Sequence, residues 1–454
     1  MLLFLSLASC HNNIIIIDGG SSGSRLSIYS YDNIDDIKSF TVFRDDQGQQ
    51  IYYHSTIAFH DCYNNTKELD NVFDEFIRNG TNRYLPEINR TVTPIFILLT
   101  GAVRILPKAE QVLIRKTLYN YLKSHYDYDI KYSYVRVVSG NEEGLFAWIT
   151  TNLVRGNLQT GNTIAVADMA GTSLQFAVEV PKNYPIGLRK YIHKVNDGNQ
   201  SFSIFAYSWD SYGDKSVAKA VCQYIYDTTK TTVSPCYYNG SVQEIVLRDG
   251  PHNFTGSANF DKCQELIARV YSKPESNLCG NLPALFMDGN ECIPYPAKID
   301  KMHAYGVFFF SLDFLNFSSY AEISEYIETI YKMGNLTYQE AKALNVSYRY
   351  TLRSLMQAHM VISFLTRGFN GDFIRLNRFR REELASLSLD WTYGAAIYMF
   401  SSVLMFGSPW WYLVIGVILG IAFIEIILLI ILCVYVRKHK WSYTPRRTSY
   451  SDLD

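Results

Sequence analysis

The sequence predicts an α/β protein of two domains, followed by a single C-terminal transmembrane helix. Three observations predict this organisation. A chain of 454 residues is long enough for two domains that each have a full core. A strand–turn–strand pattern occurs twice, around Asp18 and Asp168, and other strands run into helix starts. An apolar segment over 411–436 is long enough to span a bilayer.

The repeated pattern reads IIIID-GGSSGS-RLSIYSY in the first copy and TIAVAD-MAGTS-LQFAVEV in the second. Each copy has an apolar strand ending in Asp, a turn of small residues and a returning strand, and the alternation of apolar residues over 174–180 marks a half-buried strand. Gly and Ser in a turn let backbone N–H groups approach an anion, and the hydroxyls add donors. One such hairpin is usually ordinary. Two facing each other would hold a phosphate chain from both sides, with Asp18 and Asp168 positioned for a hydrated metal ion.

Three further segments are informative. Residues 94–106 form a buried strand that breaks at Thr100, with Arg104 beyond it. Residues 137–152 run from a strand into a helix start that carries Glu142 and Glu143. Residues 388–399 place Trp391 before a Gly/Ala-rich helix. Adjacent glutamates at a helix start are usually solvated and stabilised by the helix dipole. Between two phosphate-type loops, one of them becomes a candidate general base. Hydrolytic phosphoryl transfer needs a metal ion, N–H donors on the phosphate and such a base.

Composition excludes two classes of function. The net charge of −1 and the lack of a Lys/Arg cluster before residue 437 give no electrostatic basis for nucleic-acid binding. None of the eight Cys has zinc-site spacing, so a zinc finger is excluded as well.

The termini predict the topology. Trp410 and its neighbours form an aromatic belt before the apolar segment, and basic residues follow it, so the tail over 437–454 is expected in the cytosol and the rest of the chain outside it. Glu425 lies mid-span, either as a tolerated protonated carboxyl or as a contact through which helices pair into an oligomer. Residues 1–11 contain a signal-like segment, either cleaved or anchoring.

Glycosylation sequons and cysteines agree with a secretory-pathway lumen or the cell exterior. All the sequons precede residue 411, at Asn64, Asn79, Asn89, Asn199, Asn239, Asn253, Asn316, Asn335 and Asn345. Between the two terminal segments lies an even set of cysteines, Cys62, Cys222, Cys236, Cys263, Cys279 and Cys292, for which disulfides are expected in an oxidising compartment.

Taken in order, the five motif segments resemble the conserved regions of the apyrase, or nucleoside triphosphate diphosphohydrolase, family over 12–405. The resemblance implies two RNase H-like lobes of the actin/Hsp70/hexokinase architecture with the nucleotide in the cleft. Lobe I would cover 12–139, with 382–405 returning to it, and lobe II would cover 140–381. DGGSSGSR, with Gly23 where cell-surface members usually carry His, looks closest to the Golgi and lysosomal branch.

The resemblance also implies residue roles. Asp18 and Asp168 would hold waters on Ca²⁺ or Mg²⁺, with Thr100 and Trp391 nearby, and Glu143 would be the base for the attacking water. Arg104 would be structural. The phosphate-binding positions would be Ser21, Ser22, Gly23, Ser24, Thr100, Gly171, Thr172 and Ser173, with Gln175 orienting the water. Phe310, with Arg349 or Tyr350, would contact the base, and the disulfides would be Cys236–Cys263 and Cys279–Cys292, leaving Cys62 and Cys222 without a clear partner.

Two departures from the family pattern affect the expected function. Ala102 and Ala170 each replace a Gly near phosphate, which would weaken binding if φ there is positive. The expected activity is metal-dependent removal of terminal phosphates from nucleoside tri- and diphosphates, in the Golgi for the branch resembled. A cell-surface apyrase acting on extracellular ATP and ADP is one alternative. A weakly active ectodomain kept for binding is another, although the joint presence of Asp18, Glu143 and Asp168 argues against it.

Overall fold

The computed structural model of the chain describes residues 12–45, 47–84, 88–184, 186–271, 284–288, 291–294, 299, 302–317, 320–344, 351–367, 378–381, 390–401 and 410–440. Six predicted features lie outside these residues. They are the signal-like segment over 1–11, Cys279, the sequon at Asn345, Arg349, Tyr350 and the tail beyond 440.

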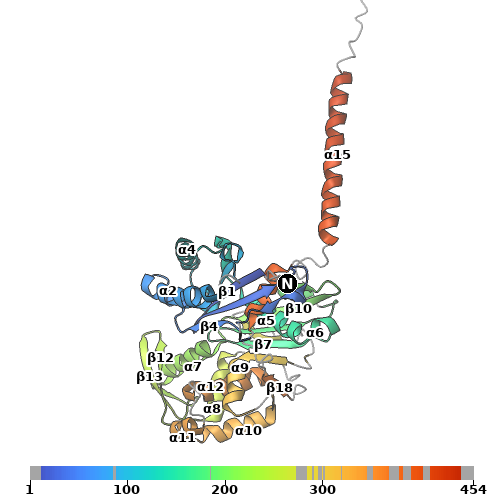
Figure 1. Cartoon of the computed structure of the whole chain (residues 1–454). Coiled ribbons are helices and arrows are strands. Elements are labelled where there is room, and N and C mark those ends of the chain that lie inside the picture. Colours follow the sequence, from blue (N-terminus) through green and yellow to red (C-terminus); the bar gives the residue numbers. More distant parts are fainter. Residues whose placement is uncertain are drawn as a thin grey trace, which may run out of the picture.

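Two mixed β-sheets dominate the fold (Figure 1). The first sheet has the order β3-β2-β1-β5-β6, with β4 also paired to β2. Its strands are β1 (Asn12–Gly20), β2 (Gly23–Tyr31), β3 (Thr41–Val42), β4 (Tyr52–Ser55), β5 (Ile95–Leu99) and β6 (Val135–Val137). The second sheet has the order β17-β18-β16-β7-β8-β10-β9. Its strands are β7 (Ala165–Met169), β8 (Leu174–Glu179), β9 (Ile192–Asn196), β10 (Ser201–Trp209), β16 (Met302–Gly306), β17 (Tyr320–Glu322) and β18 (Arg378–Arg381).

The two repeated hairpins hold the same place in the two sheets. β1 pairs antiparallel with β2 and parallel with β5, while β7 pairs antiparallel with β8 and parallel with β16. The register sets Asp18 opposite Arg25 in the first hairpin and Asp168 opposite Gln175 in the second. The sequence repeat is therefore a structural repeat, and each Asp stands near the end of its first strand.

Helices surround and separate the sheets. They are α1 (Phe59–Cys62), α2 (Thr66–Phe73), α3 (Gly101–Arg104), α4 (Lys108–His125), α5 (Gly140–Val154), α6 (Asn157–Thr160), α7 (Asp214–Thr229), α8 (Phe260–Val270), α9 (Val307–Phe314), α10 (Ile323–Gly334), α11 (Tyr338–Leu344), α12 (Thr351–Arg367), α13 (Trp391–Phe400) and α15 (Trp410–Lys440). Two small sheets complete the described chain, with strands β11 (Val233–Ser234), β12 (Val242–Leu247), β13 (Gly250–Gly256), β14 (Ala284–Asp288) and β15 (Glu291–Pro294).

α5 and α13 form the layer between the two sheets. α13 packs on β1 and β2, α5 packs on β7, β8 and β10, and the two helices pack on each other. Their shared core contains Ile16 from β1, Trp148 from α5, Ile204 from β10 and Ala395 from α13. β8 is consequently buried on both faces, not half-buried as its alternating pattern predicts, because α5 covers the face opposite the lobe's own core. The lobe boundaries given above remain a prediction.

The predicted transmembrane helix needs correction. Residues 410–440 do form one helix, α15, which stands away from the rest of the chain in Figure 1. Its described side chains include the carboxyl group of Glu425, and a carboxyl group is costly in the hydrocarbon core of a bilayer. Among the residues that the structure describes, no helix has the length and apolar character to span a membrane, so the prediction of a transmembrane helix over 411–436 is wrong.

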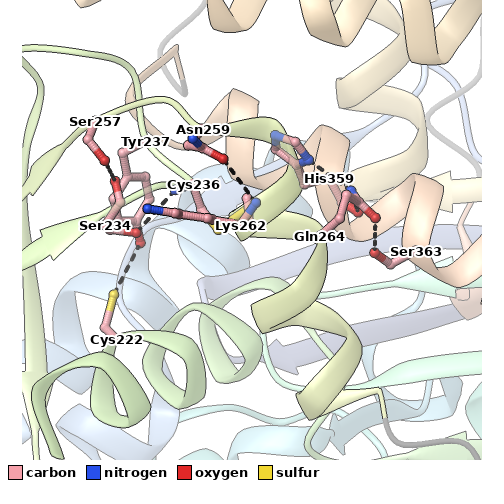
Figure 2. Close-up of a disulfide and its surroundings, with 11 residues drawn as sticks. Cys222, Ser234, Cys236, Tyr237, Ser257, Asn259, Lys262, Gln264, His359 and Ser363 are labelled. Carbon is pink, nitrogen blue, oxygen red and sulfur yellow. Dashed lines mark hydrogen bonds between the residues drawn. A yellow bond between two sulfur atoms is a disulfide. The ribbon is translucent and has the colours of Figure 1, made fainter. Parts of the chain in front are cut away.

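A disulfide joins Cys236 to Cys263, the pair that the family resemblance implies (Figure 2). Asn259 caps α8, which carries Cys263, by accepting a hydrogen bond from the backbone N–H of Lys262. The backbone N–H of Asn259 donates in turn to the carbonyl of Pro235 at 2.9 Å, which places the start of α8 beside Cys236. The second implied disulfide includes Cys279 and lies outside the described residues.

Reduction of the Cys236–Cys263 disulfide should lower thermal stability before it lowers activity. The bond closes a loop with a sequence separation of 27 residues, and disulfides of this kind contribute about 2–4 kcal/mol. The glycine turns after Asp18 and Asp168 lie outside that loop. Thermal unfolding of a Cys236→Ala/Cys263→Ala variant, compared with wild type, measures the loss of stability. Peptide mapping of the unreduced wild type checks the pairing. An unchanged melting temperature, or a peptide joining Cys236 to Cys62, would contradict it.

Candidate active site

The two hairpin turns open into one cavity of about 880 Å³ between the sheets. It is lined by residues from both turns, from the starts of α3, α5 and α13, and from α9 and α12. Among the predicted site residues, those that line it are Asp18, Ser21, Ser22, Thr100, Glu143, Asp168, Gly171, Thr172, Ser173, Phe310 and Trp391. The structure thus brings together residues that are separated by up to several hundred positions in the sequence.

The first turn presents Ser21 and Ser22 to the cavity, while its remaining predicted residues lie behind it. The Ser24 hydroxyl is buried and donates to the carbonyl of Ile57 at 3.0 Å. Gly23 has a φ of +128°, and a Cβ there would stand 2.1 Å from the carbonyl oxygen of Ser55. These two residues therefore shape the turn and leave phosphate contact to the two serines before them.

The second turn is held by the N-terminus of α7. The backbone N–H groups of Gly213, Asp214 and Lys215 donate to carbonyls of the turn at 2.9–3.0 Å. A Cβ on Gly171 would stand only 2.7 Å from the Ser21 hydroxyl oxygen, so the two turns face each other at close range and a side chain at 171 would displace that hydroxyl. The Lys215 ammonium also donates to the Ser21 carbonyl at 3.1 Å.

The two alanines that depart from the family pattern cause no backbone strain. Among the described residues, the only non-glycine residues with positive φ are Lys230, Ala258 and Asn316. Ala102 and Ala170 thus adopt conformations that a side chain tolerates. The expected weakening of phosphate binding depended on a positive φ, and that condition is not met.

The adjacent glutamates of α5 have separate environments. Glu142 completes a capping box with Ser139 and pairs with Arg136. Burial raises the pKa of Glu142, but the hydrogen bonds from Ser139 and Arg136 outweigh it and leave the pKa below its usual value. Glu143 instead lines the cavity, and its Oε2 accepts a hydrogen bond from Arg104 at 3.0 Å. The structure therefore places Glu143, and not Glu142, where a general base is needed.

Burial raises the pKa values of the cavity carboxyl groups. The pKa of Asp168 rises to about 7 because the group is buried and because Asp390 and Asp18 are close. The pKa of Asp18 also rises to about 7, again mainly through burial, although Arg25 opposes the shift. Burial raises the pKa of Glu143 to about 7 against the opposing effect of Arg104.

The cavity thus concentrates negative charge that its own cations only partly balance. The Arg25 guanidinium donates to Asp18 Oδ2 at 3.0 Å, while Asp18 Oδ1 is buried and has no hydrogen-bond partner among the residues that the structure describes. Burial also raises the pKa of Asp390. A divalent cation that prefers oxygen ligands fits this donor set, because it would balance the charge of the carboxylates and interact with Asp18 Oδ1. Within the described part of the chain, no three or more His, Cys, Asp or Glu side chains come together as a metal site.

Without a cation, the chain should lose stability as the pH rises. Asp168 has an ordinary pKa of 3.8 in the unfolded chain and a pKa of about 7 in the folded chain, so the folded state binds more protons between those values. The free energy of unfolding therefore falls as the pH rises through this window. Asp168→Asn cannot ionise and should melt roughly 2 °C or more above wild type at pH 8 in chelator, but not at pH 4.

Differential scanning fluorimetry at the two pH values measures this effect. Glu265→Gln is the matched control, because the Glu265 side chain is 65% exposed and lies far from the cavity in an exposed pair with Arg269. Equal melting temperatures for Asp168→Asn and wild type at pH 8 would mean that ionisation of the buried Asp168 carboxyl does not destabilise the folded chain.

Sequence reasoning missed several charged and polar residues of the site. Arg25 and Asp390 line the cavity, and Arg104, expected to be only structural, contacts Glu143 directly. Asp390 caps α13 by accepting from the backbone N–H of Thr392 at 2.8 Å. Its place directly before Trp391 was the available signal, because Asp is a common N-cap. Arg353 and Gln357 line the far part of the cavity, where both donate to Asp214.

Gln175 lies beside the cavity and not in its lining. Its side-chain nitrogen donates to the hydroxyls of Ser173 and Ser208 at 2.6 and 3.0 Å. The other side-chain atom, Oε1, is buried without a partner. An unpaired buried acceptor of this kind suits a water molecule that donates to it.

Comparison with known proteins identifies the family. Residues 7–408 match the GDA1/CD39 (nucleoside phosphatase) family. The chain belongs to that family. This confirms the predicted family, which is described as one of nucleoside phosphatases.

Curated relatives and one solved structure agree. The Golgi apyrase of Schizosaccharomyces pombe is 26% identical over 281 residues, covering 57% of this chain and 48% of the relative. The guanosine-diphosphatase of Saccharomyces cerevisiae is 28% identical over 212 residues, covering 45% and 39%. The chain therefore spans about half the length, or less, of the curated relatives it matches. Nucleoside triphosphate hydrolases from Neospora caninum share the fold with a TM-score of 0.53 and 12% identity, over 86% of this chain and 92% of that one.

Proposed function

We propose that the chain hydrolyses the terminal phosphates of nucleoside tri- and diphosphates, using Ca²⁺ or Mg²⁺. The observation that carries the proposal is the single cavity where both serine/glycine turns meet Asp18, Asp168 and Glu143. The turns provide hydroxyl and backbone donors for a phosphate chain, and the carboxylates provide a cation site and a base. Relatives named Golgi apyrase, nucleoside-triphosphatase and guanosine-diphosphatase support this substrate class.

Each proposed role follows from position. Ser21, Ser22 and the turn over 171–173 bind the phosphates from opposite sides. Asp18 and Asp168, with Thr100 and Trp391 nearby, hold the hydrated cation, which would neutralise charge that develops on the transferred phosphoryl group. Glu143 takes a proton from the attacking water, and Gln175 Oε1 orients that water. Phe310, which is 40% exposed at the cavity, offers an apolar face to the nucleobase.

The proposed compartment is the lumen of the secretory pathway, with removal of nucleoside diphosphates in the Golgi as the role. The Cys236–Cys263 disulfide and the glycosylation sequons support an oxidising lumen. Two yeast relatives are named Golgi apyrase. Fluorescence microscopy of the tagged full-length chain in its own cells tests this. We expect Golgi staining, and plasma-membrane staining would favour the cell-surface alternative.

Phosphate release by the full-length chain tests the activity. UDP, GDP, ADP, ATP and a nucleoside monophosphate are each supplied with Ca²⁺ and with Mg²⁺. We expect phosphate from the di- and triphosphates and none from the monophosphate. Nucleotide binding without phosphate release from any of them would favour the binding ectodomain over the enzyme.

A further inference from the structure

Arg104, at the end of α3, links residues from four different segments of the chain. Its Nη1 donates to Glu143 Oε2 and to the Val138 carbonyl, each at 3.0 Å. Its Nη2 donates to the Ser173 hydroxyl at 3.3 Å, and its side chain is only 11% exposed. A guanidinium is planar and presents its donors in a fixed fork. Fixing one edge of the Arg104 fork therefore fixes the orientation of the edge that holds Glu143.

The acceptor that fixes the other edge is Asp210, which directly follows β10 in the turn before α7. One oxygen of Asp210 accepts from Arg104 Nε at 2.8 Å and lies 2.7 Å from Arg104 Nη2. The same oxygen accepts from the Ser208 hydroxyl at 3.4 Å. Asp210 does not line the cavity, and none of the proposed roles in hydrolysis uses it.

We propose that Asp210 is a positioning residue. It holds the Arg104 guanidinium between Glu143 and the second phosphate turn, and so orients Glu143 to take a proton from the attacking water. This inference rests on the proposed hydrolytic function and assigns a role in it to a residue outside the cavity.

A closed ring of hydrogen bonds supports the assignment. Arg104 and Gln175 both donate to the Ser173 hydroxyl, Gln175 donates to Ser208, Ser208 donates to Asp210, and Asp210 accepts from Arg104. The ring therefore sets the orientation of the Gln175 amide as well as that of the guanidinium. Gln175 Oε1 is left as a buried acceptor without a hydrogen-bond partner among the described residues, while Glu143 accepts from Arg104 through Oε2.

Electrostatics explain why Arg104 needs this second carboxylate. A Cβ on Gly140, the first residue of α5, would stand 3.1 Å from Arg104 Nη2, so the guanidinium lies against the N-terminus of α5. That end of a helix carries a partial positive charge, which disfavours a cation. Asp210 supplies the compensating negative charge on the side away from Glu143. Without Asp210, the Arg104 guanidinium would keep its hydrogen bonds to Glu143 and the Val138 carbonyl, but its orientation about them would no longer be fixed.

The test compares Asp210→Asn and Asp210→Glu in the full-length chain. Misplacing a catalytic group by about 1 Å costs up to roughly 100-fold in rate. We expect Asp210→Asn to lower kcat about 10-fold or more while KM changes less than about twofold, and Asp210→Glu to restore part of the loss. The matched control is Asp227→Asn, because Asp227 is similarly exposed, at 47% against 41%, and pairs with Arg248 far from the cavity. Wild-type kcat in Asp210→Asn, or a loss no larger than in Asp227→Asn, would overturn the proposal.

Two further measurements separate this inference from the proposed function. Arg104→Gln alone and with Asp210→Asn should show equal kcat, since Asp210 acts through Arg104; additive losses would overturn the proposal.

The NMR resonance of the Arg104 Nε–H group is the second measurement. It is assigned by its absence in Arg104→Lys, and it should be visible in wild type and in Asp227→Asn and lost in Asp210→Asn. This second readout needs no turnover. An unchanged resonance in Asp210→Asn refutes the positioning role even in a chain that hydrolyses no nucleotide, whereas an inactive wild type with the expected spectra refutes only the hydrolytic function.

Discussion

Replacing Glu143 by glutamine should lower kcat by roughly 10²–10⁴-fold while nucleotide binding persists. The amide keeps the size of the side chain and can still accept a hydrogen bond from Arg104, but it cannot take a proton from water. Burial raises the pKa of Glu143 to about 7, which suits a base working near neutral pH. Steady-state phosphate release and equilibrium nucleotide binding, measured on the same preparation, separate the two effects.

Glu142→Gln is the matched control for this experiment. Glu142 has the neighbouring position on the same helix, but it is used in the capping box and the pair with Arg136. Its replacement should cost about 1 kcal/mol of stability at most and leave kcat within a few-fold of wild type. Near-normal turnover in Glu143→Gln, together with an inactive Glu142→Gln, would mean that the wrong carboxylate has been assigned.

Chelation of divalent cations should abolish phosphate release, and Ca²⁺ or Mg²⁺ should each restore it. The physical reason is the crowding of Asp18, Asp168 and Asp390 in a buried space where Asp18 Oδ1 has no partner. Without a cation, these groups repel both one another and an incoming phosphate chain. Titration of each cation into EDTA-treated protein, with rate as the readout, measures the effect.

Asp168→Asn provides the comparison for the cation experiment. With one carboxylate removed, much higher cation concentrations should be needed for half-maximal rate, and the maximal rate should fall. Exposed Glu265→Gln should respond as wild type does. Activity that persists after exhaustive chelation would contradict the role of the two hairpins in holding a cation.

The hairpins, their two aspartates and the serine/glycine turns could be predicted from the sequence because they are local patterns. β1 with β2, and β7 with β8, are each contiguous in the chain, and the turn chemistry is written in the residues between them. The starts of α5 and α13 were predictable for the same reason. Resemblance to a family then ordered these local pieces around one cleft, and the cavity contains most of them.

What the sequence could not show depends on contacts between distant segments. Arg104 and Asp210 are 106 residues apart, and only the packing of α3 against the end of β10 brings them together. Arg25 reads as an ordinary strand residue until the register places it opposite Asp18. Glu142 and Glu143 have the same local pattern; the family resemblance favoured Glu143, and the structure separates them by the burial of Glu143 in the cavity and the use of Glu142 in the capping box. The sequence likewise does not determine the sign of φ at Ala102 and Ala170, which depends on the conformation of the turns.

The most direct test is a crystal structure of the chain with a non-hydrolysable nucleoside triphosphate analogue and Mn²⁺, located by its anomalous scattering. We expect the terminal phosphate in the cavity against both turns, the metal ion between Asp18 and Asp168, and a water molecule within hydrogen-bond distance of Glu143. A nucleotide bound outside this cavity, or phosphates in the cavity with Glu143 turned away from the terminal one, would contradict it.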